Sequence, residues 1–402
     1  MTSSEYDLIL QGGHVIDPAN DVDGIRDVAI SGGRIAAAAP NLPAERARKA
    51  ISVAGSLVTP GLVDIHVHAY GGYSGWLFPD EHALPNGTTT VVDTGSAGWK
   101  SFEEFKTTII DQSKVRVLGF LNIVGSGMLG PEVENNIDDM EPEPTAECVA
   151  RYPELLVGTK TAHFIKPGWA AVDRAVEAGQ MCGKPTMIDF RPQPERSYED
   201  LILKHMRSGD IHTHMYAAHI PLLDESGRVQ EFAWEARRRG VIFDVGHGAG
   251  SFWFRRAVPA VEHGFIPDSI STDMHKYSIL IPQATMPLTM SKLWNIGMPL
   301  REVILRSTVT PAREINRPEL GTLSPGAGAD VAVFQMEEGE FGFVDSGRAS
   351  MRGTRRLRCL MTLRDGQVVW DLNGLAWKDW RAAGEYGVLD QWGEERTTGQ
   401  RR

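Results

Sequence analysis

The stretch Thr59-Pro60-Gly61-Leu62-Val63-Asp64-Ile65-His66-Val67-His68 joins a turn to an apolar run that ends in two histidines. Alternate residues of a strand point to the same side, so His66 and His68 project together from its carboxyl end. Parallel-barrel enzymes carry their active sites at that end of their strands, and imidazole suits zinc and similar divalent metals. The alternative is a pair of surface histidines on an edge strand, and the pair alone does not decide between the two.

Seven further β-rich runs follow, separated by helical stretches. Two of these stretches have amphipathic spacing, one from Trp169 through Val176 and one from Val229 to Ala236. Alternating strands and helices imply a parallel sheet, and eight such units fit a closed (β/α)₈ barrel. A doubly wound open sheet is the rival architecture, but no GxGxxG motif follows the first strand. The predicted strands are Leu62–His68, Thr89–Thr94, Val115–Asn122, Leu155–Thr161, Thr186–Phe190, Ile211–Tyr216, Val241–Val245 and Ser269–Asp273.

Both ends of the chain consist of short β-rich runs and tight turns. Glycine pairs at 12–13 and 32–33 separate such runs near the start, and Asp365-Gly366 separates two more near the end. We predict a small composite β-sandwich domain formed from both termini, residues 1–59 and 322–380, beside a barrel of residues 60–321. Two separate extensions are the alternative. Residues 381–402 are expected to form a polar C-terminal tail.

Composition argues against several classes of partner. The 402-residue chain has a formal net charge of -11, which does not suit a nucleic-acid surface. Its one basic cluster, Arg352 to Arg358, is interpreted as a solvated turn. Three cysteines without a Cys-x-x-Cys pair favour a reducing compartment. Because Met1 to Tyr6 is polar and no apolar run reaches the ~20 residues of a membrane span, we expect a cytoplasmic protein with no membrane partner.

Residue types that bind metals recur where the predicted strands end. Lys160 ends the fourth strand, and a lysine in a barrel mouth is costly unless it is paired, neutral or modified. A lysine that reaches solvent is the alternative, and each of the other residues could simply cap a helix or lie in a loop. Ligand-type residues stand at the carboxyl ends of six of the eight predicted strands. One shared site explains this better than six independent coincidences. The other members lie at or just after the ends of strands five to eight and are Asp189, His214, His247 and Asp273.

These residues and their flanking motifs resemble the amidohydrolase superfamily, and within it the dihydroorotase-like amidohydrolase/deacetylase metallohydrolases. The resemblance extends over nearly the whole chain. It implies a distorted (β/α)₈ TIM barrel with a composite β-sandwich, and one or two divalent metal ions, usually zinc. The motifs that carry it are the glycine-rich β-segment at the N-terminus, Pro60 to His68, Asp-Val-Gly-His-Gly at 244–248, Ser-Thr-Asp at 271–273 and Gly-Ala-Asp-Val at 328–331.

The resemblance also implies roles for individual residues. His66 and His68 correspond to ligands of the more buried metal. Lys160 corresponds to a bridging lysine that CO₂ carboxylates to a carbamate, which would explain how a lysine is tolerated there. His214 corresponds to a ligand of the second metal. Asp273 corresponds to a ligand of the first metal that also shuttles the proton.

The fifth strand departs from the family pattern. Many relatives carry a histidine where this chain has Asp189. Aspartate can bind zinc, but it would make the second site more anionic and harder. His163 could supply an imidazole instead, and a plain loop histidine is the alternative for that residue. A mononuclear enzyme is the alternative to a two-metal site.

The implied function is hydrolysis of an acyl amide or an acetyl ester, as in deacetylases. Water activated to hydroxide by the metal would attack the carbonyl, with Asp273 as general base. Opening of a cyclic amide or imide, as in dihydroorotases, is the second candidate. A non-catalytic scaffold is the third, and it is disfavoured because the ligand-type residues are present. The substrate is expected to be a small molecule and the enzyme a homo-oligomer.

Four residues near the strand ends are assigned to substrate binding. Arg191 could grip a carboxylate, and His247 could stabilise the oxyanion. A surface arginine and a turn histidine without substrate contact are the alternatives. The four residues are His163, Arg191, His247 and Ser251.

Overall fold

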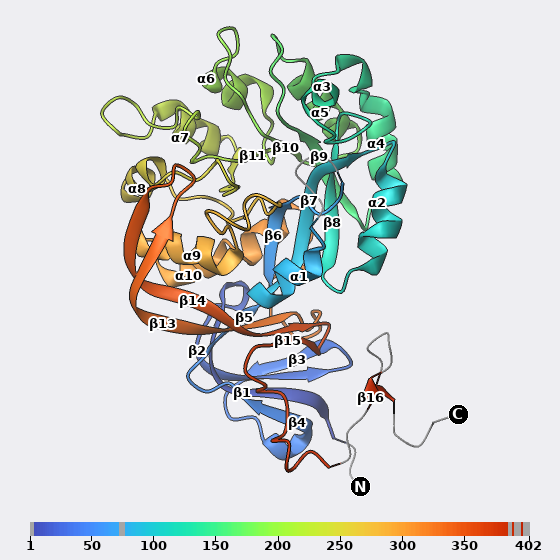
Figure 1. Cartoon of the computed structure of the whole chain (residues 1–402), viewed down its shortest axis with the longest axis vertical. Helices are drawn as coiled ribbons and strands as arrows, with labels where there is room; N and C mark the ends of the chain where they lie inside the picture. The colour runs from blue at the N-terminus through green and yellow to red at the C-terminus, as the bar shows by residue number, and fades with distance from the viewer. Residues whose placement is uncertain (1–3, 72–76, 385–387, 390–394, 397–402) are drawn as a thin grey trace.

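The computed structural model describes residues 4–71, 77–384, 388–389 and 395–396. Figure 1 shows two parts stacked along the long axis, a mixed sheet at the bottom and a curled parallel sheet with helices around it above. Within the described residues, no helix is both long and apolar enough to cross a membrane.

Strands from both ends of the chain share the lower, eight-stranded sheet. Its order is β15-β14-β13-β5-β1-β2-β3, with β4 paired to β1. Apolar side chains such as Leu10, Val28 and Val333 form its buried cluster. Arg352 to Arg358 lie within β14, so their interpretation as a solvated turn is wrong. The strands are β1 (Tyr6–Asp17), β2 (Val22–Ser31), β3 (Arg34–Ala39), β4 (Ala47–Ser52), β5 (Leu57–Pro60), β13 (Val331–Val344), β14 (Ser350–Arg364) and β15 (Gln367–Asp371).

The upper sheet has seven parallel strands in the order β12-β11-β10-β9-β8-β7-β6. Every residue of β6 and β7 is buried, as expected for parallel strands covered on both faces. The last two strands are shorter than the sequence predicts. The strands are β6 (Leu62–Val67), β7 (Thr88–Gly98), β8 (Arg116–Asn122), β9 (Leu156–Thr161), β10 (Thr186–Ile188), β11 (Ile211–His212) and β12 (Ile242–Phe243).

The predicted strand Ser269–Asp273 is not a regular strand. Residues 269–274 nevertheless contact both edges of the curled sheet, through parallel bridges from Ser269 to Asp244 and from Met274 to Val67. Asp273 has φ +47°, in the left-handed region, and this interrupts the extended backbone. The segment therefore brings the carboxyl end of the first strand of the sheet close to that of the last.

Helices flank the upper sheet (Figure 1). The two predicted amphipathic stretches form α5 and α7, which bury Val172 and Ala175, and Ala233 and Ala236. The helices are α1 (Pro79–Ala83), α2 (Phe102–Thr108), α3 (Pro131–Glu134), α4 (Pro142–Arg151), α5 (Ala170–Met181), α6 (Tyr198–Asp200), α7 (Glu231–Arg238), α8 (Phe254–Glu262), α9 (Met286–Asn295), α10 (Leu300–Leu305) and α11 (Val309–Glu314).

Short segments complete the described chain. They are 3₁₀ turns at Pro18–Asn20, Ala44–Arg46, Leu84–Asn86, Ile110–Gln112 and Ile137–Asp139, a π-helical turn at Leu201–His205, and the paired strands β16 (Val388–Leu389) and β17 (Glu395–Arg396). The last two strands lie in the predicted C-terminal tail.

The β13–β14 hairpin links the two parts. It rises from the lower sheet alongside α8, α9 and α10 (Figure 1). At its tip, Asp345 Oδ2 accepts a hydrogen bond from Phe254 N at 3.0 Å, and Ser346 N donates to Phe252 O at 2.8 Å. These bonds join the hairpin of the lower sheet to the loop that follows β12 and to the start of α8.

Candidate metal centre

A cavity of about 50 Å³ lies at the carboxyl ends of the parallel strands. Most of its lining is polar, although it is surrounded by buried strands. It is lined by His66, His68, Met128, Lys160, Ala162, His163, Asp189, His214, Asp273 and His275.

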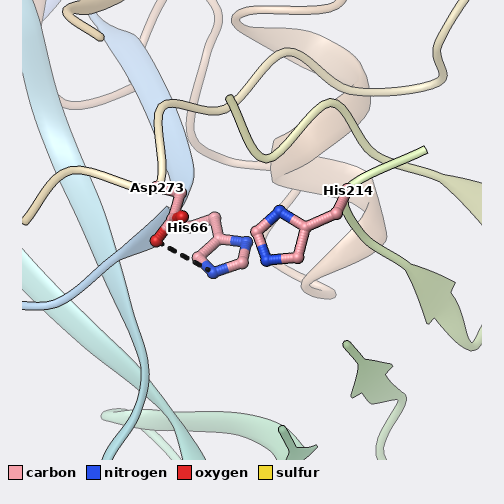
Figure 2. A group of neighbouring side chains, drawn as sticks. All are labelled: His66, His214 and Asp273. Carbon is pink, nitrogen blue, oxygen red and sulfur yellow. Dashed lines mark ion pairs between the residues drawn. The ribbon is translucent and has the colours of Figure 1, made fainter. Parts of the chain in front are cut away.

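Three of these side chains form a compact group of potential ligands (Figure 2). One atom each from His66, His214 and Asp273 lies within 4.8 Å of the others, and all three residues are buried. His66 Nε2 is 3.5 Å from Asp273 Oδ1. Zinc bonds of about 2 Å would separate neighbouring ligand atoms by about 3–4 Å, so one ion can reach all three after small adjustments.

The orientation of His66 is fixed by two residues behind it. Its Nδ1 lies 2.8 Å from Thr213 Oγ1, and that hydroxyl donates to Asp244 Oδ2 at 2.7 Å. Since the hydroxyl proton is used on the carboxylate, His66 Nδ1–H donates to the hydroxyl and Nε2 keeps its lone pair. Burial, together with the charges of Lys160 and His214, holds the pKa of His66 well below its usual range. His66 is therefore a neutral imidazole, the form that binds metals.

His214 and His68, which are also predicted metal ligands, each have a hydrogen-bond partner at Nδ1. His214 Nδ1 donates to Gly246 O at 2.7 Å, which leaves Nε2 for a metal. His68 Nδ1 lies 3.1 Å from Ser96 Oγ, and Ser96 N donates to the buried carboxylate of Asp93 at 2.9 Å. Such partners select the tautomer and the ring angle of a metal-binding histidine.

Asp273 carries a charged carboxylate among these rings. Its Oδ1 is 3.2 Å from His68 Nε2, and its Oδ2 is 3.8 Å from His275 Nε2. Burial raises the pKa of this carboxyl, but His275, His68 and His214 outweigh burial and lower it to about 2. The group is therefore ionised at neutral pH and can bind a cation or accept a proton.

Lys160 and Asp189 also line the cavity. Lys160 is buried, and burial lowers the pKa of its amine although Asp189 and Asp273 oppose the shift. Burial raises the pKa of Asp189, but electrostatic interactions with His214 and His163 outweigh burial and hold the pKa far below its usual range. Asp189 Oδ2 is 3.3 Å from His163 Nε2 and 3.9 Å from His214 Nε2.

His163 lies beside the residue that departs from the family pattern. Its Nδ1 is 2.8 Å from Oε2 of the buried Glu134, on the side away from Asp189. Its φ of +54° is in the left-handed region, which costs a non-glycine residue about 1 kcal/mol. The structure therefore places an imidazole next to Asp189, flanked by two carboxylates.

Three predicted residues do not line the cavity. Arg191 is exposed, and its charge contributes to the lowered pKa of Asp189. His247 stacks on Phe252 with ring centroids 4.7 Å apart, and both its ring nitrogens have partners. Ser251 follows, with its backbone N bonded to His247 O. The other seven predicted residues come together in the lining, namely His66, His68, Lys160, His163, Asp189, His214 and Asp273.

Sequence reasoning missed several members of this site. His275 lines the cavity two residues after Asp273, and that spacing was the available signal. Thr213 directly precedes His214, and Asp244 begins the 244–248 motif. Nothing in the local sequence indicates that both stand behind His66.

The polar atoms of the cavity fit a bound cation. Within the described part of the chain, His66 Nε2, Lys160 Nζ and Asp189 Oδ1 are buried without a hydrogen-bond partner. Each such atom costs about 1–3 kcal/mol when it stays unsatisfied. A divalent ion would satisfy the imidazole and the carboxylate together, and a donor set of imidazoles and carboxylates suits zinc or a similar metal.

Comparison with known proteins identifies relatives over most of the chain. No family model matches it. A curated deacetylase of Agrobacterium fabrum is 33% identical over 333 residues, which cover 80% of this chain and 81% of the relative. A solved adenine deaminase superposes with a TM-score of 0.84 at 28% identity, over 91% of this chain and 100% of that one. A solved dihydroorotase gives a TM-score of 0.82 at 28% identity, over 90% and 99%. The chain belongs to the amidohydrolase superfamily.

Proposed function

We propose that this protein is a metal-dependent amidohydrolase that cleaves an acyl amide or an acetyl ester. The observation that carries the proposal is the buried group of His66, His214 and Asp273, at the strand ends and beside orphaned polar atoms. The name of the Agrobacterium relative favours a deacetylase. Opening of a cyclic amide remains the alternative, because one of the similar structures is a dihydroorotase.

We further propose that the upper sheet closes as a distorted (β/α)₈ barrel of residues 60–321. Support comes from residues 269–274, which contact β12 on one side and β6 on the other. Residues 1–59 and 322–380 would form the β-sandwich, as suggested by the sheet that they share. This arrangement gathers the ligand-type residues around one axis.

For the metals, we propose that His66, His68 and Asp273 hold the more buried ion. A carboxylated Lys160 would be a ligand shared with a second ion, which Asp189 and His214 would also hold, and zinc is the expected metal. A bound divalent ion polarises a carbonyl and lowers the pKa of water, which are the two demands of amide hydrolysis. Asp189 would make the second position harder and more anionic than a histidine would.

The residues of the chain supply the proton chemistry. The Asp273 carboxylate is ionised, so it can take the proton from the attacking water and return it to the leaving amine or alkoxide. His163 lines the cavity and Arg191 lies near Asp189, and we propose that they contact the substrate. His247 and Ser251 lie outside the cavity lining, so any influence of theirs on the substrate is indirect.

Metal analysis combined with a substrate panel tests the proposal. Protein produced with added zinc should hold one or two equivalents of a divalent metal. It should hydrolyse N-acetyl amino acids or acetyl esters faster than cyclic amides such as dihydroorotate and hydantoins. A reversed preference would support the dihydroorotase-like alternative. A metal content below about 0.2 equivalents would favour the scaffold, since sites of this kind hold their ion tightly.

The oligomeric state and the cellular location of the protein can both be measured directly. We propose a homo-oligomeric, cytoplasmic enzyme with a small-molecule substrate. Light scattering of the purified protein counts its subunits, and fractionation of the producing cells locates it.

A further inference from the structure

Lys292 is a buried lysine outside the candidate metal centre. It lies on α9 and is 1% exposed. Its Nζ is 2.7 Å from His247 Nε2, 2.8 Å from Val344 O and 3.4 Å from Pro282 O. It therefore joins three segments, the loop after β12, the loop before α9 and the end of β13.

The protonation of this cluster follows from its acceptors. His247 Nδ1 lies 2.9 Å from Gly248 O, which can only accept, so Nδ1 carries the ring proton. Burial holds the pKa of His247 well below its usual range, so the ring is neutral and Nε2 accepts from Lys292. Lys292 Nζ has three N–H donors as an ammonium and two as a neutral amine, so it can donate to His247 Nε2 in either form.

Gly248 connects this cluster to the Asp273 carboxylate. Gly248 O accepts from His247, and Gly248 N donates to Thr272 O at 2.9 Å. Gly248 has φ +52°, and a Cβ atom on it would lie 2.2 Å from Asp273 Oδ2. This peptide therefore forms the wall against which the Asp273 carboxylate rests.

We propose that Lys292 is a positioning residue of the hydrolytic site, acting through His247 to hold the Gly248 peptide against Asp273. The inference rests on the proposed function, in which Asp273 is both metal ligand and general base. Through Val344 the same lysine ties this wall to the β13–β14 hairpin, so the lower domain supports the catalytic geometry. Removing the hydrogen-bond partners that orient metal ligands commonly changes metal affinity or activity by about 10–100-fold.

A double-mutant cycle separates positioning from general stabilisation. Lys292→Met removes the donors, and His247→Phe removes the ring nitrogens while keeping the stack on Phe252. Each single variant is expected to lower kcat and zinc affinity about 10–100-fold, with KM changed less than about threefold. Because Lys292 acts through His247, the double variant should be no worse than the poorer single variant. Lys204→Met, at an exposed lysine paired with Asp200, is the control and should match the wild type.

Nitrogen NMR of the wild-type protein tests the inference even where Lys292→Met does not fold. His247 should show a protonated Nδ1 and an unprotonated Nε2. A protonated Nε2 would overturn the inference, as would multiplied losses in the double variant or wild-type kcat and zinc affinity in Lys292→Met. A wild-type protein that binds no metal would overturn the proposed function and this inference with it. Normal metal binding and hydrolysis in an unaffected Lys292→Met would overturn the inference alone.

Discussion

The Cα of Gly248 lies so close to the Asp273 carboxylate that a Cβ atom there would be 2.2 Å from Oδ2. Gly248→Ala should therefore displace the carboxylate, and the positive φ of +52° adds strain of about 1 kcal/mol. We expect kcat to fall at least about tenfold and zinc affinity to fall with it, because the proposed function gives Asp273 a part in both. Steady-state kinetics and zinc competition with a chelator measure the two effects.

Gly250 gives the matched control on the same loop. A Cβ atom on Gly250 meets nothing within 4 Å among the described residues, and its φ lies outside the left-handed region. Gly250→Ala should behave as the wild type in both assays. Equal losses in the two variants would mean that loop stiffness, rather than the contact with Asp273, controls activity.

The hydroxyl of Thr213 stands between His66 and Asp244. Thr213→Val keeps the shape but leaves His66 Nδ1 and Asp244 Oδ2 without their shared partner. The ring of His66 loses its fixed tautomer, so zinc affinity should fall about 10–100-fold. Thr213→Ser keeps the hydroxyl and should restore most of the affinity. Wild-type zinc binding in Thr213→Val would contradict this role.

Lys292 should make the stability of the protein depend on pH. Burial lowers its pKa from the usual 10.5 to about 7, although Asp345 opposes the shift. Between these values the unfolded chain holds a proton that the folded chain has released. The free energy of unfolding should therefore rise with pH relative to Lys292→Met, by at most about 1.4 kcal/mol per pH unit.

Urea unfolding at pH 7, 8 and 9 measures this difference. Lys204→Met, at an exposed lysine, should differ from the wild type by the same amount at all three values. A difference between wild type and Lys292→Met that stays constant or shrinks with rising pH would contradict the lowered pKa.

Strands β6 and β7 could be predicted from β-branched residues that follow a glycine, in LVDIHV after Gly61 and in TTTVVDT after Gly87. The segment 269–273 has β-prone residues but does not form a regular strand. Its hydroxyls turn to buried carboxylates, with Ser269 Oγ donating to Asp244 and Thr272 Oγ1 to Asp64. These contacts and the left-handed Asp273 are set by tertiary packing, which a local pattern does not contain.

The site could be predicted where a ligand-type residue follows a strand, because parallel strands gather their carboxyl ends at one rim. The residues that hydrogen-bond to these ligand-type residues could not be predicted, since they come from segments distant in the sequence. Thr213 meets His66 across 147 residues of sequence. His247 follows a strand as well, yet its ring lies against Phe252 and Lys292, so position after a strand does not settle where a side chain points.

The two buried lysines of the site region should respond differently to CO₂. Lys160 Nζ has no hydrogen-bond partner within the described residues, whereas Lys292 Nζ has three. Burial lowers the pKa of the Lys160 amine, which favours the neutral, nucleophilic form. That amine can attack CO₂, forming an N–C bond and releasing one proton, and the carbamate would supply oxygen ligands where an orphaned nitrogen now lies.

Protein loaded with zinc in ¹³C-bicarbonate should therefore show one carbamate carbon signal by NMR. Lys160→Met should lose this signal and most of its second equivalent of zinc. Lys292→Met should keep the signal, because Lys292 Nζ already has three hydrogen-bond partners. Loss of the signal in Lys292→Met, or its survival in Lys160→Met, would contradict the assignment of the carbamate to Lys160. Absence of the signal in zinc-loaded wild type would leave Lys160 as an unmodified amine and remove the proposed bridge between two metals.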